Sequence, residues 1–371
     1  MRPRLSKCVL LLALVGGGLV LALGLAEGAV RLAAPQDLDH SISWYQAHPV
    51  YRFRHRAGLD RRAKWFTYYH LRTNARGLRG AREIPYDPAG RWRVLIHGDS
   101  FTFGNGLDED DLFATRTERL LHQRGLTRAQ VVNMGVSASG TSLQYLYFRE
   151  EGRRYRPNVV VIAVFLGNDF LDDARDGAFT LEEGRLVEQP FEVPLAKRLT
   201  DTGLYQFFAA RSHLLVFVRD RFTRLPGAQD DEAAAYTDAR RFPARYALNE
   251  AVLLRFVEAA EAEGAVPVVL LLPTPWQLLS AHGRPADGDY FPLAERYREA
   301  LLETCRAQAL RCLDATPALA AATADPWRLF LHDAEGQADF HYNADAHAVV
   351  ATLLTDTLAG LYGAPSEAPT P

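Results

Sequence analysis

The 371-residue sequence predicts an α/β fold built on a parallel β-sheet and preceded by one transmembrane helix. Short apolar runs at 94–96, 131–133 and 159–165 each end in small and polar residues before a helical or loop stretch begins. Buried parallel strands are typically unbroken apolar runs of this kind. Strands that alternate with helical stretches indicate β-α-β units, and these units build a parallel sheet.

The remaining elements follow the same alternation along the chain. Two further buried strands are expected at 266–272 and at Leu313-Asp314, which gives five strands in all. Residues 171–245 interrupt the alternation with a hairpin at 179–187 and an aromatic-rich stretch at 204–222. Apolar residues at helical spacing predict helices over residues 112–123, 143–152, 251–263, 293–309 and 344–362.

The N-terminal 30 residues have the most distinctive composition. Arg2, Arg4 and Lys7 precede an uncharged run of 19 residues, 8–26, which is long enough to cross a bilayer. The positive flank places the N-terminus on the cytoplasmic side, so the rest of the chain is expected beyond the membrane. We expect an uncleaved signal anchor. The alternative is a signal peptide cleaved after Gly24-Leu25-Ala26, followed by secretion.

The predicted organisation has four parts. A signal anchor (1–30) leads into a stalk and N-terminal extension (31–70), a main domain (71–363) and a Pro- and Ala-rich tail (364–371) that we expect to be disordered. Residues 171–245 form an insertion in the main domain. This insertion is either a lid that selects the substrate and touches the membrane surface, or a helix packed on the sheet.

Composition and motifs exclude several classes of function. The net charge is −3 and the basic residues are spread along the chain, so no nucleic-acid partner is expected. The sequence contains no phosphate-binding glycine loop and no metal-ligand spacing, so neither a cofactor nor a metal is expected. Cys305 and Cys312 either form a disulfide in an oxidising compartment or remain free buried thiols.

Polar residues gather where a parallel sheet would place chemistry. Ser100 follows the strand at 94–96 in a Gly98-Asp99-Ser100 turn, beyond the carboxyl end of the strand. Alone, this serine could equally be a helix cap. Ester chemistry needs a nucleophile, a base, a group that orients the base, and donors for the oxyanion. Further candidates for these roles lie at strand ends and before the last helix: Ala138, Gly140, Asn168, Asp339 and His341.

These stretches, in this order, resemble the four sequence blocks of the SGNH hydrolases, the GDSL esterase superfamily. Residues 98–104 resemble the first block, 133–140 the second, 167–169 the third and 339–343 the last. The resemblance extends over residues 70–362. It implies a flavodoxin-like, three-layer αβα fold with a five-stranded parallel sheet.

The resemblance also implies roles for individual residues. Ser100 would be the nucleophile, His341 its base, and Asp339 the carboxylate that orients the imidazole. The oxyanion donors would be the Ser100 N–H, the Asn168 side-chain amide and one backbone N–H of the second block. That last donor is either Ala138, which stands where many relatives carry glycine, or Gly140.

The implied function is that of a serine esterase without metal or cofactor. Its substrate would be an acylated small molecule, lipid or glycan. Residues 8–26 would anchor it in the membrane, with the catalytic domain on the periplasmic or extracellular side. Two alternatives remain open: an O-acyltransferase that acts on an envelope polysaccharide, and a non-catalytic envelope-binding module.

Overall fold

The computed structural model of the chain describes residues 2–36, 38, 44–223, 238–284 and 293–362. The chain forms two compact units, a smaller one from 1–43 and 194–230 and a larger one from 44–193 and 231–371. The predicted disordered tail, 364–371, lies outside the described residues.

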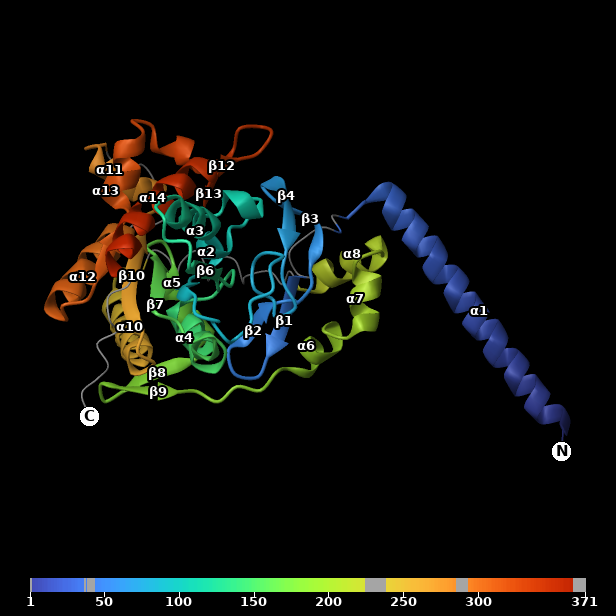
Figure 1. Ribbon diagram of the computed structural model, residues 1–371. Helices are drawn as coiled ribbons and strands as arrows, with labels where there is room; N and C mark the ends of the chain where they lie inside the picture. Colours follow the sequence, from blue (N-terminus) through green and yellow to red (C-terminus); the bar gives the residue numbers. More distant parts are fainter. Residues whose placement is uncertain (1, 37, 39–43, 224–237, 285–292, 363–371) are drawn as a thin grey trace. The chain divides into compact units, whose positions relative to one another are not determined.

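The core of the larger unit is a five-stranded sheet in the order β11–β10–β7–β5–β6, with every strand parallel to its neighbours (Figure 1). Its strands are β5 (Trp92–His97), β6 (Ala129–Asn133), β7 (Val159–Phe165), β10 (Val266–Leu272) and β11 (Cys312–Asp314). Numbered along the chain, this is the 2-1-3-4-5 order of flavodoxin-like folds. The predicted five-stranded parallel sheet is therefore confirmed.

Helices pack on both faces of the sheet because strand side chains point alternately to opposite faces. Leu95 joins one apolar core, whereas its neighbours Val94 and Ile96 join the other. The first core is covered by α4 (Thr141–Glu150), α5 (Asp169–Asp176), α10 (Phe242–Ala262) and α12 (Ala294–Ala307). The second is covered by α3 (Phe113–Gln123), α11 (Pro275–Ala281), α13 (Thr316–Ala322) and α14 (Ala344–Leu361). The three-layer αβα architecture is confirmed.

Residues 44–72 differ from the predicted stalk. They form two antiparallel hairpins and belong to the same compact unit as the sheet. The hairpins consist of β1 (Tyr45–His48) with β2 (Arg52–His55), and of β3 (Asp60–Trp65) with β4 (Thr67–Arg72). Fully buried Trp44 packs with Leu71 and Phe103. The predicted start of the main domain at residue 71 is therefore too late, and the compact unit begins at Trp44.

The predicted insertion, 171–245, is divided between the two units. The hairpin β8 (Phe179–Glu182) and β9 (Arg185–Glu188), which was predicted, belongs to the larger unit. Three helices belong to the smaller unit together with α1 (Arg2–Ala33): α6 (Leu195–Thr200), α7 (Gly203–Ala209) and α8 (His213–Thr223). Among the described residues, α1 contains the one helix segment long and apolar enough to cross a membrane, Val9–Ala33.

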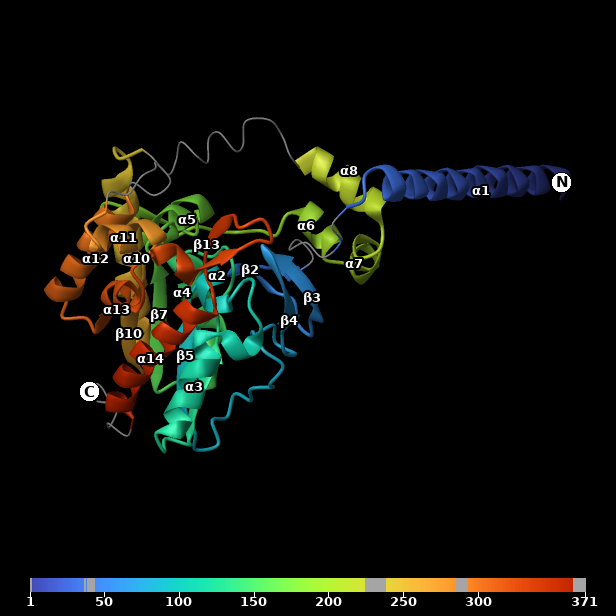
Figure 2. The same cartoon turned by 90° about the horizontal axis from the view of Figure 1, so that it is seen from above.

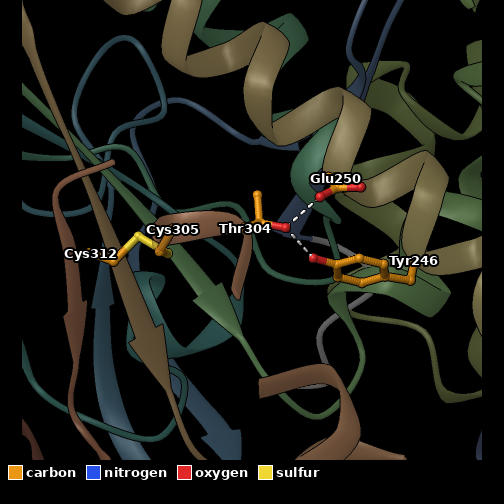
Figure 3. The surroundings of a disulfide bond; sticks show 5 residues. All are labelled: Tyr246, Glu250, Thr304, Cys305 and Cys312. Carbon is orange, nitrogen blue, oxygen red and sulfur yellow. Dashed lines mark hydrogen bonds between the residues drawn. A yellow bond between two sulfur atoms is a disulfide. The ribbon is translucent and has the colours of Figure 1, made fainter. Parts of the chain in front are cut away.

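A disulfide bond joins Cys305 of α12 to Cys312 of β11 (Figure 3). Beside it, the Thr304 hydroxyl donates to the Glu250 carboxylate, and the Tyr246 hydroxyl lies 2.6 Å from the Thr304 oxygen. Tyr246 and Glu250 belong to α10. These contacts connect the edge strand to two helices that cover one face of the sheet.

We expect the disulfide to stabilise the larger unit, because it closes the 305–312 loop in the unfolded chain as well. A loop of this length corresponds to about 2 kcal/mol of unfolding free energy. The double variant Cys305→Ser/Cys312→Ser should therefore melt a few degrees lower than the wild type in near-UV circular dichroism, and dithiothreitol should lower only the wild-type midpoint. Equal midpoints for the wild type and the double variant without dithiothreitol would contradict this role.

Candidate active site

Ser100 is the first residue of α2 (Ser100–Phe103), directly beyond the carboxyl end of β5. The turn is tight, because a side chain at Gly98 would collide with Thr102. The Asp99 carboxylate accepts the Phe101 N–H and caps α2. Burial raises the pKa of Asp99 to about 6, although the hydrogen bond from Phe101 and the charge of His341 oppose this shift.

Asp339 and His341 lie on β13 (Ala338–Tyr342), which pairs with β12 (Phe330–His332). Residues two apart on a strand share a face, so both side chains point the same way, and Phe340 between them packs against Trp276. His341 Nε2 lies 2.7 Å from Ser100 Oγ, and His341 Nδ1 lies 3.0 Å from Asp339 Oδ2. The structure thus brings the three predicted residues into one hydrogen-bonded chain.

Aromatic rings hold the His341 imidazole from two sides. Phe101 stacks on it at a centroid distance of 4.9 Å, and Trp65 meets it edge-on at 5.1 Å. Phe101 itself stacks on Phe165, the last residue of β7, at 3.9 Å. The imidazole orientation is therefore fixed by packing as well as by its hydrogen bonds.

Trp65, at the end of β3, is a site residue that the sequence patterns did not reveal. Its Nε1–H lies 2.8 Å from Asp339 Oδ2 and 3.2 Å from His341 Nδ1. When His341 donates Nδ1–H to Asp339, that nitrogen cannot accept a proton, so the indole donates to the carboxylate. The spacing within β3 and β4 gives no indication of this contact, since it joins residues 274 apart in sequence.

Asp339 is kept ionised by the groups around it. Burial disfavours its charge, but hydrogen bonds from His341, the Phe340 N–H and Trp65, together with the charge of His341, outweigh the burial. The pKa of Asp339 therefore lies below its ordinary value of 3.8. An ionised carboxylate at this position can stabilise an imidazolium that forms on His341.

The predicted oxyanion residues occupy the same edge of the sheet. Asn168 follows β7, the neighbour of β5, and is the N-cap residue of α5. The Gly140 N–H is directed at the Asp176 carboxylate, 3.4 Å away, and a side chain at Gly140 would collide with Asp173. Ala138 has an exposed side chain and a φ of +65°, in the left-handed region that glycine adopts at no steric cost. The Gly140 N–H thus faces a carboxylate in this structure.

A row of carboxyl groups on the inner face of α5 supports the second-block loop. Its members, spaced i, i+3, i+4 and i+7 on one helix face, are Asp169, Asp172, Asp173 and Asp176. Asp173 accepts the Ser142 N–H at 2.7 Å and an Asn249 amide N–H at 2.8 Å. Burial raises the pKa of Asp173 to about 6, against the effect of these hydrogen bonds. This row was not predicted, although the spacing from Asp169 onward is visible in the sequence.

The fold and the side chains at its strand ends are those of an α/β ester hydrolase. Residues 96–349 match the sequence profile of the GDSL-like Lipase/Acylhydrolase family. The chain belongs to that family. The match includes Ser100, Asn168, Asp339 and His341, whereas Trp65 and the hairpins at 44–72 lie outside it.

Several solved structures are similar to this chain at low identity. A protein of the G-D-S-L family from Desulfitobacterium hafniense DCB-2 has 16% identity and a TM-score of 0.39, over 72% of this chain and 99% of that one. The acetyl xylan esterase AlAXEase has 14% identity and a TM-score of 0.42, over 72% and 99%. Axe2, an acetyl-xylooligosaccharide esterase from Geobacillus Stearmophilus, has 14% identity and a TM-score of 0.43, over 74% and 94%, in a mutant form. No curated protein matches the chain.

We expect Trp65→Phe to lower kcat about tenfold with KM unchanged, because a hydrogen bond to a charged group is worth about 1.5–3 kcal/mol. The ring is retained, so packing on His341 is kept. Steady-state kinetics of the two proteins measures the change in kcat.

Trp92→Phe is the matched control. Trp92 begins β5, at the end of the strand opposite Ser100, and packs on Tyr362. It should leave kcat unchanged. A Trp65→Phe enzyme with the wild-type kcat would show that the indole N–H contributes nothing to the reaction through Asp339.

Proposed function

We propose that the chain hydrolyses carboxylic esters through a Ser100–His341–Asp339 triad. Ser100 Oγ attacks the ester carbonyl carbon while His341 Nε2 takes the hydroxyl proton, and Asp339 stabilises the resulting imidazolium. His341 then gives the proton to the leaving alcohol, which leaves an acyl group on Ser100. A water molecule, deprotonated by His341, then attacks the acyl carbon. The bond to Ser100 Oγ breaks, His341 returns the proton to that oxygen, and the acid is released. The 2.7 Å contact between His341 Nε2 and Ser100 Oγ carries this proposal.

The oxyanion would be stabilised by three donors: the Ser100 N–H, the Asn168 amide and the Ala138 N–H. Among the two second-block candidates we assign Ala138, because the Gly140 N–H already faces the Asp176 carboxylate. The Asn168 Oδ1 atom is buried without a hydrogen-bond partner among the described residues, whereas its Nδ2 is the donor that such a site requires.

Water is the proposed acceptor, because the site is not closed from solvent. The His341 side chain is 14% exposed, and Ser100 is only partly buried. We further propose that α1 remains as a membrane anchor and that the larger unit works on the periplasmic or extracellular side. The long apolar helix and the basic residues before it support this location.

The direct test is ester hydrolysis by the full-length protein in detergent micelles. The wild type should release p-nitrophenol from a short p-nitrophenyl ester, and Ser100→Ala should lower kcat by at least about a thousandfold. Ser280→Ala, at an exposed serine of α11, is the matched control and should retain full activity.

Equal activity of Ser100→Ala and the wild type would exclude Ser100 as the nucleophile. Release that requires an added oligosaccharide would identify a sugar, rather than water, as the acceptor.

A further inference from the structure

The end of the apolar run in α1 is tied directly to the N-terminus of α8. Glu27 is the first charged residue after the run 8–26. Its carboxylate accepts the backbone N–H groups of His213 and Leu214, both at 2.9 Å, and the Ser212 hydroxyl at 2.8 Å. A carboxylate in this position satisfies N–H groups that have no partner within the helix. Arg31 reinforces the joint, because it binds both Glu27 and the Arg211 carbonyl.

The hydrogen bonds of Glu27 to residues 212–214 also fix the position of α7 along the α1 axis. The Phe208 carbonyl accepts the Ser212 N–H at 2.8 Å, and Ser212 in turn donates its hydroxyl to Glu27. Ser212 therefore links the carboxyl end of α7 directly to Glu27, the residue that follows the apolar run. The 19 residues of that run span about 28 Å as a helix, close to the roughly 30 Å hydrocarbon core of a bilayer. Glu27 would then sit at the membrane–water interface, together with the end of α7.

The two helices before α8 present large apolar side chains to solvent. In α6 these side chains are spaced i, i+4, and in α7 they are spaced i, i+3, i+4, so each helix has one apolar face. Each is 50–72% exposed within the described residues: Leu195, Leu199, Leu204, Phe207 and Phe208. Figure 2 shows α6, α7 and α8 following one another beside the end of α1, all within the smaller unit.

The charge of the same segment suits an anionic membrane surface. Residues 194–223 contain five basic and two acidic residues. Arg198 lies in the last turn of α6, three residues after Leu195, and the Arg211 guanidinium covers the Phe207 ring at 4.2 Å. Basic side chains beside exposed Leu and Phe are the composition of helices that lie in the plane of the interface.

We propose that α6 and α7 lie flat in the bilayer interface, with their five exposed leucine and phenylalanine side chains inserted among the lipids. Together with α1 they form a membrane-bound platform of one spanning helix and two interfacial helices. The proposal rests on membrane anchoring by α1 and is independent of the ester chemistry. The two other possible occupants of the apolar face are the larger unit of the same chain and a second copy of the chain.

Tryptophan quenching by brominated lipids tests the proposal in the full-length protein. All five native tryptophans belong to the larger unit, so the wild type gives the baseline. The probes are Leu199→Trp and Phe208→Trp on the apolar faces. The matched control is Lys197→Trp, which is exposed and lies on the opposite side of α6 from Leu199. Each protein is reconstituted into phosphatidylcholine–phosphatidylglycerol vesicles, with or without bromine on the upper acyl chain.

After subtraction of the wild-type signal, emission from the two probes should fall at least about twofold in brominated vesicles, as expected for side chains about 5–10 Å deep. Emission from Lys197→Trp should change little. Equal quenching of all three variants, or none, would overturn the proposal. A blue-shifted but unquenched probe would show instead that protein covers this face, and would overturn it as well.

Flotation separates failure of this inference from failure of the anchor. A wild-type protein that does not float with vesicles would exclude both anchoring and the platform. One that floats, but whose probes are unquenched, would exclude the platform alone. Ester hydrolysis by the same samples reports on Ser100 and is affected by neither outcome.

Discussion

The elements of the larger unit together position one contact, that between His341 Nε2 and Ser100 Oγ. It joins residues 241 apart in sequence. Ser100 is placed by β5, which lies between β7 and β6, at the point where the strand order reverses and open α/β sheets bind ligands. His341 is placed by β13 and by α14, which is tied to α3 through the His347 Nδ1 acceptor for the Phe113 N–H. Strand β5 and strand β13 therefore each hold one partner of the hydrogen bond between Ser100 and His341.

The second block and the N-terminal hairpins restrain the parts around this contact. The α5 carboxyl row binds the backbone that leads from Ala138 to Ser142, so the second-block loop is held from behind. Trp65 reaches Asp339 from a hairpin outside the family match. The candidate site thus includes the family core together with an extension that contributes one hydrogen-bond donor. Residues 44–72 are therefore part of the compact unit that holds the site rather than a spacer.

The central strands could be predicted because buried parallel strands are unbroken apolar runs, as in Val159–Phe165. The hairpins at 44–72 could not, because their strands are short and their solvent-facing positions are charged, as in Asp60–Trp65. Ser100, Asp339 and His341 were identified by block order, and the structure places them within hydrogen-bond distance. Trp65 was missed because a donor recruited by tertiary pairing leaves no local pattern. The proposal of Ala138 over Gly140 rests on the position of Asp176, which the sequence does not reveal.

Covalent labelling tests the central claim most directly. A fluorophosphonate reacts only with a serine that a neighbouring base activates. The account predicts one adduct per chain by the intact mass of the full-length protein, mapped to Ser100 by mass spectrometry of its peptides after digestion. It also predicts loss of that adduct in His341→Gln, which removes the base and keeps a polar side chain. An adduct on another serine, or undiminished labelling of Ser100 in His341→Gln, would contradict the account.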